Sequence, residues 1–249
     1  MHETTKNKAL HIDGDMILYK AACAAEEEIR WDDDTWTLQT NMLIAKDKAL
    51  TAIERICDSL SSSFVHLYFT PRVTFRHDLW PAYKANRKDK RKPLGISELR
   101  EYLMGVYESS IFANIEADDA IGLAVTKDPN GSVAVSGDKD FGTLPITWYN
   151  HLKDELRVIT EEEADHFHLV QSLMGDSTDG FAGLKGFGIK TAEKLLAKKG
   201  ATWQTVVEAY ESKGFSKDDA LMTARLARIL RHGDYDYKTN EVTLWEPPV

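Results

Sequence analysis

The chain has 249 residues and a formal net charge of −9, and its composition is 43% hydrophobic and 29% charged. Such a composition is typical of a soluble globular protein, and no apolar stretch reaches the roughly 20 residues that cross a bilayer. The first residues lack the apolar run of a signal peptide, so we expect a cytoplasmic protein. Only Cys23 and Cys57 are present, and we expect small buried residues rather than a disulfide or zinc framework. Any metal site must then use oxygen ligands.

The first 150 residues alternate strand-like and helix-like apolar patterns. In chain order they predict a strand at residues 9–12, a helix at 15–25, a short outlying strand at 36–40, a helix at 44–60, a strand at 64–69, a helix at 97–107, a strand at 110–115, a helix at 117–126, and strands at 132–135 and 146–148. This alternation indicates βαβ units around a mainly parallel sheet, and so an α/β fold.

The pattern changes after residue 159. Thr160, followed by three Glu residues, predicts a capped helix start, and helical periodicity continues to about Leu230. A final β-prone stretch covers residues 241–245. The sequence therefore predicts an α/β core at 1–159 and a mostly helical region at 160–249.

The distribution of charge matters more than its sum. A net charge of −9 argues against nucleic acid as a partner, because phosphate contacts need Lys and Arg. Residues 83–93, hereafter the basic run, nevertheless carry six cations against one Asp, while residues 26–28 and 32–34 are all acidic. A basic run is by itself more typical of a solvated face. We expect this one to hold phosphates while the acidic segment faces away.

Acidic residues recur where predicted strands end. In a parallel α/β sheet, ligands bind beyond the carboxyl ends of the strands. The groups are Asp13 and Asp15 after the first strand, Glu116, Asp118 and Asp119 after the third, Asp138 and Asp140 after the fourth, and Asp176 with Asp179 at the start of the helical region. One such residue alone is more typical of a helix cap.

Four acidic groups in one place would repel each other unless cations neutralised them. Carboxylates with water suit Mg²⁺ or Mn²⁺, and two such ions about 4 Å apart can activate a water and stabilise the leaving oxygen of a phosphodiester. We therefore expect a two-metal phosphoryl site.

Two further segments are suited to nucleic acid. If residues 83–87 are helical, Tyr83 and Arg87 share a face, so that the ring can stack on a base while Lys84 and Arg87 grip phosphates. Residues 183–192 form a glycine-spaced turn that opens a helix, where backbone amides and Lys190 can hold a phosphate. Glycine also serves as an ordinary helix stop, so this second signal alone is moderate.

These blocks together resemble the 5′-nuclease superfamily over about residues 10–196. The family includes flap endonucleases, the 5′-nuclease domain of bacterial DNA polymerase I and the small 5′-to-3′ exonucleases of tailed phages. The blocks are Ile12-Asp13-Gly14, Phe75-Arg76 with Tyr83-Lys84-Ala85-Asn86-Arg87, Glu116-Ala117-Asp118-Asp119, Gly137-Asp138-Lys139-Asp140, and Gly175-Asp176-Ser177-Thr178-Asp179-Gly180 leading into Gly186-Phe187-Gly188-Ile189-Lys190-Thr191-Ala192.

The resemblance implies a PIN-like α/β core, a helical arch at residues 76–108 over the active site, and a DNA-binding helix–three-turn–helix motif at 175–200. It implies a Mg²⁺-dependent 5′-to-3′ exonuclease with flap endonuclease activity. The substrate would be DNA with a free 5′ end, duplex or flap, with an RNA–DNA hybrid left open. A role in phage DNA replication or recombination in the host cytoplasm follows by analogy.

The resemblance also assigns site residues. The first metal would take Asp13, Glu116, Asp118 and Asp119, and the second Asp138, Asp140, Asp176 and Asp179. Lys84 and Arg87 would contact the scissile phosphate. Other DNA contacts would be Arg76, Tyr83, Lys88, Lys185, Gly186, Gly188 and Lys190, and the Gly186–Gly188 turn can also bind K⁺.

One position departs from the family pattern. Many relatives place a metal-binding Asp after the second strand, where this chain has Thr70. Asp15 would compensate if it reaches the metal, or would otherwise cap the following helix.

Two alternatives remain at this stage. Residues 13–15 and 137–140 loosely imitate a haloacid-dehalogenase-like phosphatase, although that family favours Thr or Val after the position that Met16 occupies. The other is a DNA-binding protein whose metal site has decayed.

Overall fold

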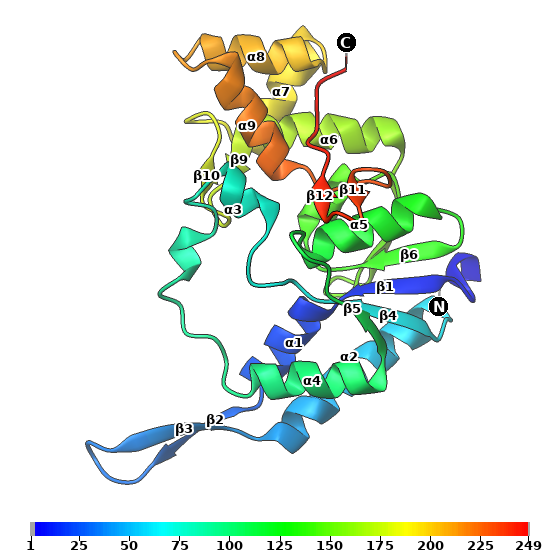
Figure 1. Ribbon diagram of the computed structural model, residues 1–249, viewed down its shortest axis with the longest axis vertical. Helices are drawn as coiled ribbons and strands as arrows, with labels where there is room; N and C mark the ends of the chain where they lie inside the picture. Colours follow the sequence, from blue (N-terminus) through cyan, green and yellow to red (C-terminus); the bar gives the residue numbers. More distant parts are fainter. Residues whose placement is uncertain (1–2, 249) are drawn as a thin grey trace.

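The computed structural model describes residues 3–248, and its centre is a six-stranded sheet in the order β5-β4-β1-β6-β7-β8 (Figure 1). The strands are β1 (Ala9–Asp13), β4 (Phe64–Tyr68), β5 (Glu108–Ser110), β6 (Ser132–Val135), β7 (Thr147–Asn150) and β8 (Glu155–Val158). All neighbouring pairs are parallel except β7 and β8. The α/β fold with a mainly parallel sheet is confirmed.

Helices cover both faces of this sheet. On one side lie α1 (Gly14–Cys23), α2 (Met42–Leu60) and α4 (Ile96–Val106), and on the other lies α5 (Ala117–Lys127) (Figure 1). Side chains alternate along each strand, so Leu10 and Ile12 pack with α1 and α2 while Tyr68 and Ala134 pack with α5. The chain runs from β1 to β4 and β5 on one side and returns to β6 on the other. This reversal places a crevice beyond the carboxyl ends of β1 and β6.

A helical layer follows the sheet. It consists of α6 (Glu161–Met174), α7 (Ile189–Lys199), α8 (Trp203–Glu211) and α9 (Lys217–Ala227), and it has its own apolar core. The start of α6 is the predicted one, with Thr160 and Glu163 in a capping box. Two short hairpins join this region, β9 (Gly175–Asp176) with β10 (Phe181–Ala182) and β11 (Tyr235–Asp236) with β12 (Glu241–Val242). A domain boundary at residue 159 stays a prediction.

Several predicted bounds were wrong. The strand expected at 110–115 is β5, which ends at Ser110, because the chain then leaves the sheet and Asn114 takes a left-handed φ of 66°. The strand expected at 146–148 is β7, one residue later, and the antiparallel β8 was not predicted. Cys23 is exposed rather than buried.

The arch is much less helical than expected. Between residues 76 and 108 the helices are α3 (Phe75–Leu79), a 3₁₀ turn η2 (Ala85–Arg87) and α4, and residues 88–93 belong to none of them. Lys84 has a left-handed φ of 53° and Pro81 and Pro93 interrupt the segment, so no continuous helix forms. Tyr83 and Arg87 therefore do not share a helical face, and this prediction was wrong.

The short strand predicted at 36–40 is confirmed as β3 (Trp36–Thr40). Its unpredicted partner is the acidic segment β2 (Glu26–Arg30), and the hairpin projects from the lower end of the molecule (Figure 1). Glu26 pairs with Arg91 of the basic run, so the expectation that the acidic segment faces away is wrong for this residue.

Among residues 3–248, no helix is both long and apolar enough to cross a membrane.

Candidate active site

The first site carboxylate stands at the end of the central strand. Asp13 closes β1, is 8% exposed and caps α1 by accepting a hydrogen bond from the Met16 amide at 3.1 Å. Its second oxygen accepts from Ser136 Oγ at 3.0 Å, just beyond β6. Burial and the nearby Asp15 raise the pKa of Asp13 to about 6.

The start of α5 supplies the next two carboxylates. Glu116 is 3% exposed and accepts hydrogen bonds from Tyr83 Oη at 3.0 Å and from Lys84 Nζ at 2.8 and 2.9 Å. Burial would raise the pKa of Glu116, but Lys84 and Arg76 hold it below its usual value. Asp118 forms no hydrogen bond within the described part of the chain, and burial together with Glu116 raises its pKa well above the usual value.

A second group follows β6 and α6. Asp138 caps η3 (Lys139–Thr143) by accepting from the Asp140 amide at 2.9 Å, and Asp140 accepts from Gln171 Nε2 at 2.5 Å. Burial and Asp138 raise the pKa of Asp140 to about 7. Asp176 accepts from Lys139 Nζ at 3.2 Å; burial would raise its pKa, but Lys139 keeps it low.

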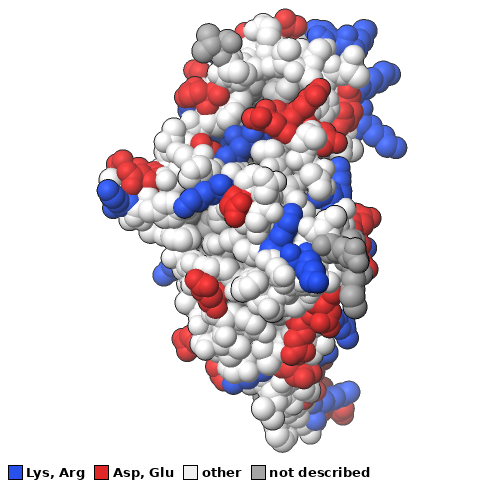
Figure 2. Space-filling model, turned by 90° about the vertical axis from the view of Figure 1, so that its right-hand side faces the viewer, with Lys and Arg blue, Asp and Glu red and all other residues white. Residues whose placement is uncertain are grey.

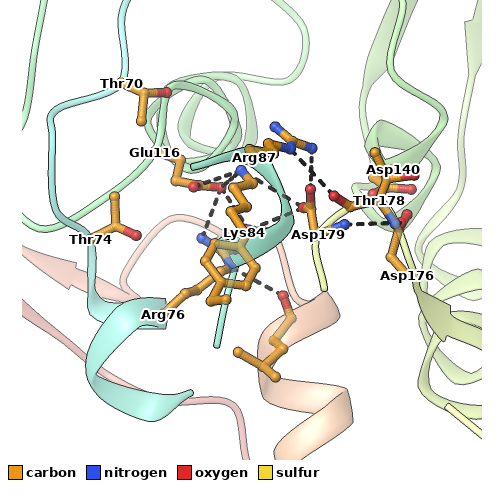
Figure 3. Close-up of polar contacts among 12 residues, drawn as sticks. Thr70, Thr74, Arg76, Lys84, Arg87, Glu116, Asp140, Asp176, Thr178 and Asp179 are labelled. Carbon is orange, nitrogen blue, oxygen red and sulfur yellow. Dashed lines mark hydrogen bonds and ion pairs between the residues drawn. The ribbon is translucent and has the colours of Figure 1, made fainter. Parts of the chain in front are cut away.

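Asp179 joins the two groups (Figure 3). One carboxylate oxygen accepts from Tyr83 Oη at 3.1 Å, and the other accepts from Arg87 Nη2. Lys84 Nζ lies 3.8 Å away. Asp179 therefore lies beside Lys84, which also touches Glu116, and residues distant in sequence meet at one place.

Cations separate these carboxylates. Lys84 and Arg87 lie among Glu116 and Asp179, and Lys139 lies between Asp140 and Asp176. Within residues 3–248, no three acidic, His or Cys side chains meet at metal-ligand spacing. The donor set nevertheless fits a hard divalent cation, because clustered carboxylates with raised pKa values require positive charge and Asp118 accepts no hydrogen bond from any described residue.

Two predicted site residues are instead in the core. Arg76 is 3% exposed and donates to both oxygens of Asp119, at 2.5 and 2.8 Å, while Asp119 is 0% exposed. The Glu116 and Leu230 amides also donate to Asp119. A DNA contact by Arg76 and a metal ligand role for Asp119 are therefore wrong, because each side chain is buried and satisfied by the other.

Tyr83 does not offer its ring to a base. It is 2% exposed and packs against Phe181 and the edge of His77. Its hydroxyl instead orients Glu116 and Asp179. The stacking role was wrong because the helical face on which it depended does not form.

The end of β4 reaches the site, as the family pattern requires. Thr70 Oγ1 accepts from the Ala117 amide at 3.1 Å, at the first turn of α5. Asp15 does not cap α1, since Asp13 does; its carboxylate accepts from the Thr70 amide at 2.7 Å and from Arg100 Nη2 at 3.3 Å. Arg100 was missed by sequence reasoning because nothing local distinguishes it from other α4 surface residues.

The remaining predicted DNA contacts lie on the surface. Lys88, Lys185 and Lys190 are exposed, Gly186 has a φ of 87°, and Gly188 caps α7. A Cβ at either glycine would meet nothing within 4 Å, so the turn is open to a large ligand. The face in Figure 2, the right-hand side of Figure 1, intersperses acidic and basic side chains and is no continuous basic surface.

Comparison with known proteins gives the family. Residues 8–168 match the family model of the 5′-3′ exonuclease, N-terminal resolvase-like domain. The chain is 29% identical to an exonuclease of Escherichia phage T7 over 96% of this chain and 93% of the relative. It is 30% identical to the flap endonuclease Xni of Shewanella sp. strain ANA-3, over 83% and 79%.

Solved structures share the fold. The phage T5 D15 protein co-crystallised with metal ions has a TM-score of 0.66 at 15% identity, covering 88% of each chain. A T5 D15 flap endonuclease complex with DNA and metal ions gives 0.67 at 14% identity, also over 88% of each. These matches set aside the phosphatase and the non-enzymatic alternatives, and the chain belongs to the 5′-3′ exonuclease family and is a nuclease.

Proposed function

We propose that this chain is a divalent-metal-dependent 5′-to-3′ exonuclease that also cleaves 5′ flaps of DNA. The supporting observation is that Glu116, at the start of α5, and Asp179, of the β9–β10 hairpin, meet around Lys84 and Arg87. Burial and other carboxylates close by raise the pKa values of Asp13, Asp118 and Asp140. The similar T5 protein was crystallised with DNA and metal ions, and the Shewanella relative is a flap endonuclease. The substrate is DNA with a free 5′ end, duplex or flap.

The proposed cofactor is a pair of Mg²⁺ or Mn²⁺ ions. Asp13, Glu116 and Asp118 would hold the first ion, and Asp138, Asp140, Asp176 and Asp179 the second. When bound, such ions activate water and stabilise the leaving oxygen of a phosphodiester. The carboxylates would hold the two ions in place. Ser136 and Gln171 fix the orientations of Asp13 and Asp140 by hydrogen bonds.

Lys84 and Arg87 are the proposed phosphate-binding residues. Burial would lower the pKa of Lys84, but Glu116 and Asp118 keep it above its usual value, so its ammonium stays charged. Both cations pair with carboxylates that the metal ions would neutralise, which frees them to hold the scissile phosphate. Cations that point at the negative charge developing in the transition state lower the barrier to hydrolysis.

Duplex binding is proposed at Lys88, Lys185, Lys190 and the Gly186–Gly188 turn. K⁺ binding at that turn, action on RNA–DNA hybrids, a role in phage replication or recombination, and a cytoplasmic location stay predictions.

The direct test is nucleotide release from 5′-labelled duplex and flap DNA with Mg²⁺ or with EDTA. Asp138→Asn should lower cleavage by several orders of magnitude while DNA binding survives, because the change removes metal charge and not the phosphate contacts. Asp47→Asn, at an exposed position on α2, should change neither. Cleavage that persists in EDTA, or equal losses of binding and cleavage in Asp138→Asn, would contradict the proposal.

A further inference from the structure

The basic run is fixed at its first end by the site itself. The Lys84 amide donates to the Asp179 carbonyl at 2.7 Å, and Arg87 pairs with the Asp179 carboxylate. Asn86 Nδ2 donates to the carbonyls of Ser177 and Thr178 at 3.1 and 3.2 Å. This end of the run is therefore attached to the loop that carries Asp179.

Its far end is fixed by a residue that the mechanism does not use. Glu26 accepts two hydrogen bonds from Arg91, at 2.6 and 2.8 Å, and a third from the Leu94 amide at 2.8 Å. Thr40, the partner of Glu26 across the hairpin, donates to the Leu94 carbonyl at 2.9 Å. The Glu26 side chain is only 12% exposed, and its bidentate contact is the geometry by which a guanidinium also binds phosphate.

Between these anchors the run forms one wall of a cavity of about 480 Å³. Arg87, Lys90, Arg91 and Lys92 line it from the run, and Arg100 lines it from α4. Thr70 and Asp15 also line it, so the cavity reaches the end of β4, beside the first turn of α5. A cation-lined space next to the carboxylates suits a single strand with its phosphates.

We propose that Glu26 is a positioning residue, which holds the far end of the basic run so that its cations line this cavity for a single-stranded 5′ arm. The inference rests on the proposed function. Without the anchor, each binding event must order the run anew, and that conformational entropy weakens binding. Lys84 and Arg87 keep their own anchors at Glu116 and Asp179, so turnover at saturation should survive.

Limited trypsin digestion of the free protein tests the anchor without any nuclease activity. Cleavage after Lys88, followed by mass spectrometry, should quicken about tenfold in Glu26→Ala, and less in Glu26→Gln, which still accepts from Leu94. Glu28→Gln, an exposed change on the same strand, is the matched control and should match wild type. The swap Glu26→Arg with Arg91→Glu restores the ion pair but not the acceptor for the Leu94 amide, so it should slow cleavage relative to Glu26→Ala without reaching the wild-type rate. Equal rates of trypsin cleavage in Glu26→Ala and the wild type would show that Glu26 does not anchor the run. This result would hold whether or not the protein is a nuclease.

Kinetics with two DNAs test the role in specificity. For a duplex with a single-stranded 5′ flap, Glu26→Ala should raise KM by about tenfold with kcat nearly unchanged. For a flapless duplex with a recessed 5′ end, both constants should stay within about twofold. Equal changes on both substrates would reject a role specific to the single-stranded arm. An inactive wild type would instead reject the proposed function, and the digestion result would still decide whether Glu26 anchors the run.

Discussion

The Arg76 guanidinium and the Asp119 carboxylate stabilise the fold by a buried, bidentate ion pair. Removing one partner of such a pair leaves an uncompensated buried charge, so Asp119→Asn should lower the free energy of unfolding by about 3–5 kcal/mol. Urea unfolding in EDTA measures this loss. The Mg²⁺ dependence of the remaining folded enzyme should be unchanged; a shifted Mg²⁺ titration without lost stability would show that Asp119 is a ligand.

Thr70 is the residue at which the chain departs from its family. Its hydroxyl accepts from the Ala117 amide, which places this side chain at the first turn of α5, beside the proposed metal ligands Glu116 and Asp118. Thr70→Asp keeps an acceptor there and adds the missing charge, so cleavage should saturate at lower Mg²⁺. Thr70→Asn, an acceptor without charge, is the control and should leave the midpoint of the Mg²⁺ titration in place.

Asp15 tests whether a neighbour has compensated for Thr70. Its contacts to the Thr70 amide and Arg100 place it at the edge of the site rather than at a helix cap. If it contributes charge to the metal, Asp15→Asn should move the Mg²⁺ titration upward and Thr70→Asp should reverse that shift. A titration unmoved by either substitution would show that neither position reaches the metals.

At the scale of elements, the basic run combines two kinds of cation. Lys84 and Arg87 are held by site carboxylates, whereas Lys88 and Lys92 are exposed. Lys84→Ala and Arg87→Ala should therefore lower kcat strongly, because they act on developing charge. Lys88→Ala and Lys92→Ala should weaken DNA binding and reduce its salt dependence instead. Equal losses of turnover by all four at saturating DNA would contradict this division.

At the scale of the whole molecule, the raised pKa values of two carboxyl groups should make the free energy of unfolding depend on pH. Folding raises the pKa of Asp13 from 3.8 to about 6 and that of Asp140 from 3.8 to about 7, so the folded state binds these protons more tightly. The ionisation of these two groups then opposes folding, with no penalty below about pH 4 and the full penalty above about pH 7. Other groups act in the same window: burial lowers the pKa values of His11, His151 and His168, so these histidines stabilise the fold as pH rises, and only a comparison of variants isolates the carboxylates.

In EDTA the amount by which Asp140→Asn raises the Tm above that of the wild type should therefore grow between pH 4 and 7.5, and Mg²⁺ should raise the wild-type Tm most at the higher pH. Thermal melts of the wild type and Asp140→Asn at both pH values, with EDTA or with Mg²⁺, measure the two effects. A Tm difference in EDTA that is the same at both pH values would contradict the raised pKa of Asp140.

The sequence by itself determined the fold class and which carboxylates follow the central strands. Hydrophobic periodicity located the central strands and the long helices, because burial against the sheet imposes that period. The carboxylates after β1 and β6 were located from the sequence, because parallel strands bring their carboxyl ends to one edge. The resemblance to the 5′-nuclease superfamily, rather than residue spacing, indicated Lys84 and Arg87 as site residues.

Only the tertiary structure decided which charged residues are free to act. The Arg76–Asp119 and Glu26–Arg91 pairs join residues 43 and 65 positions apart, and local patterns carry no information about such partners. Lys84 adopts a left-handed backbone that no periodicity predicts, so the helical face expected for Tyr83 and Arg87 never forms. Whether a charged side chain faces solvent, a metal or another charge depends on burial, and burial is set when distant elements pack together.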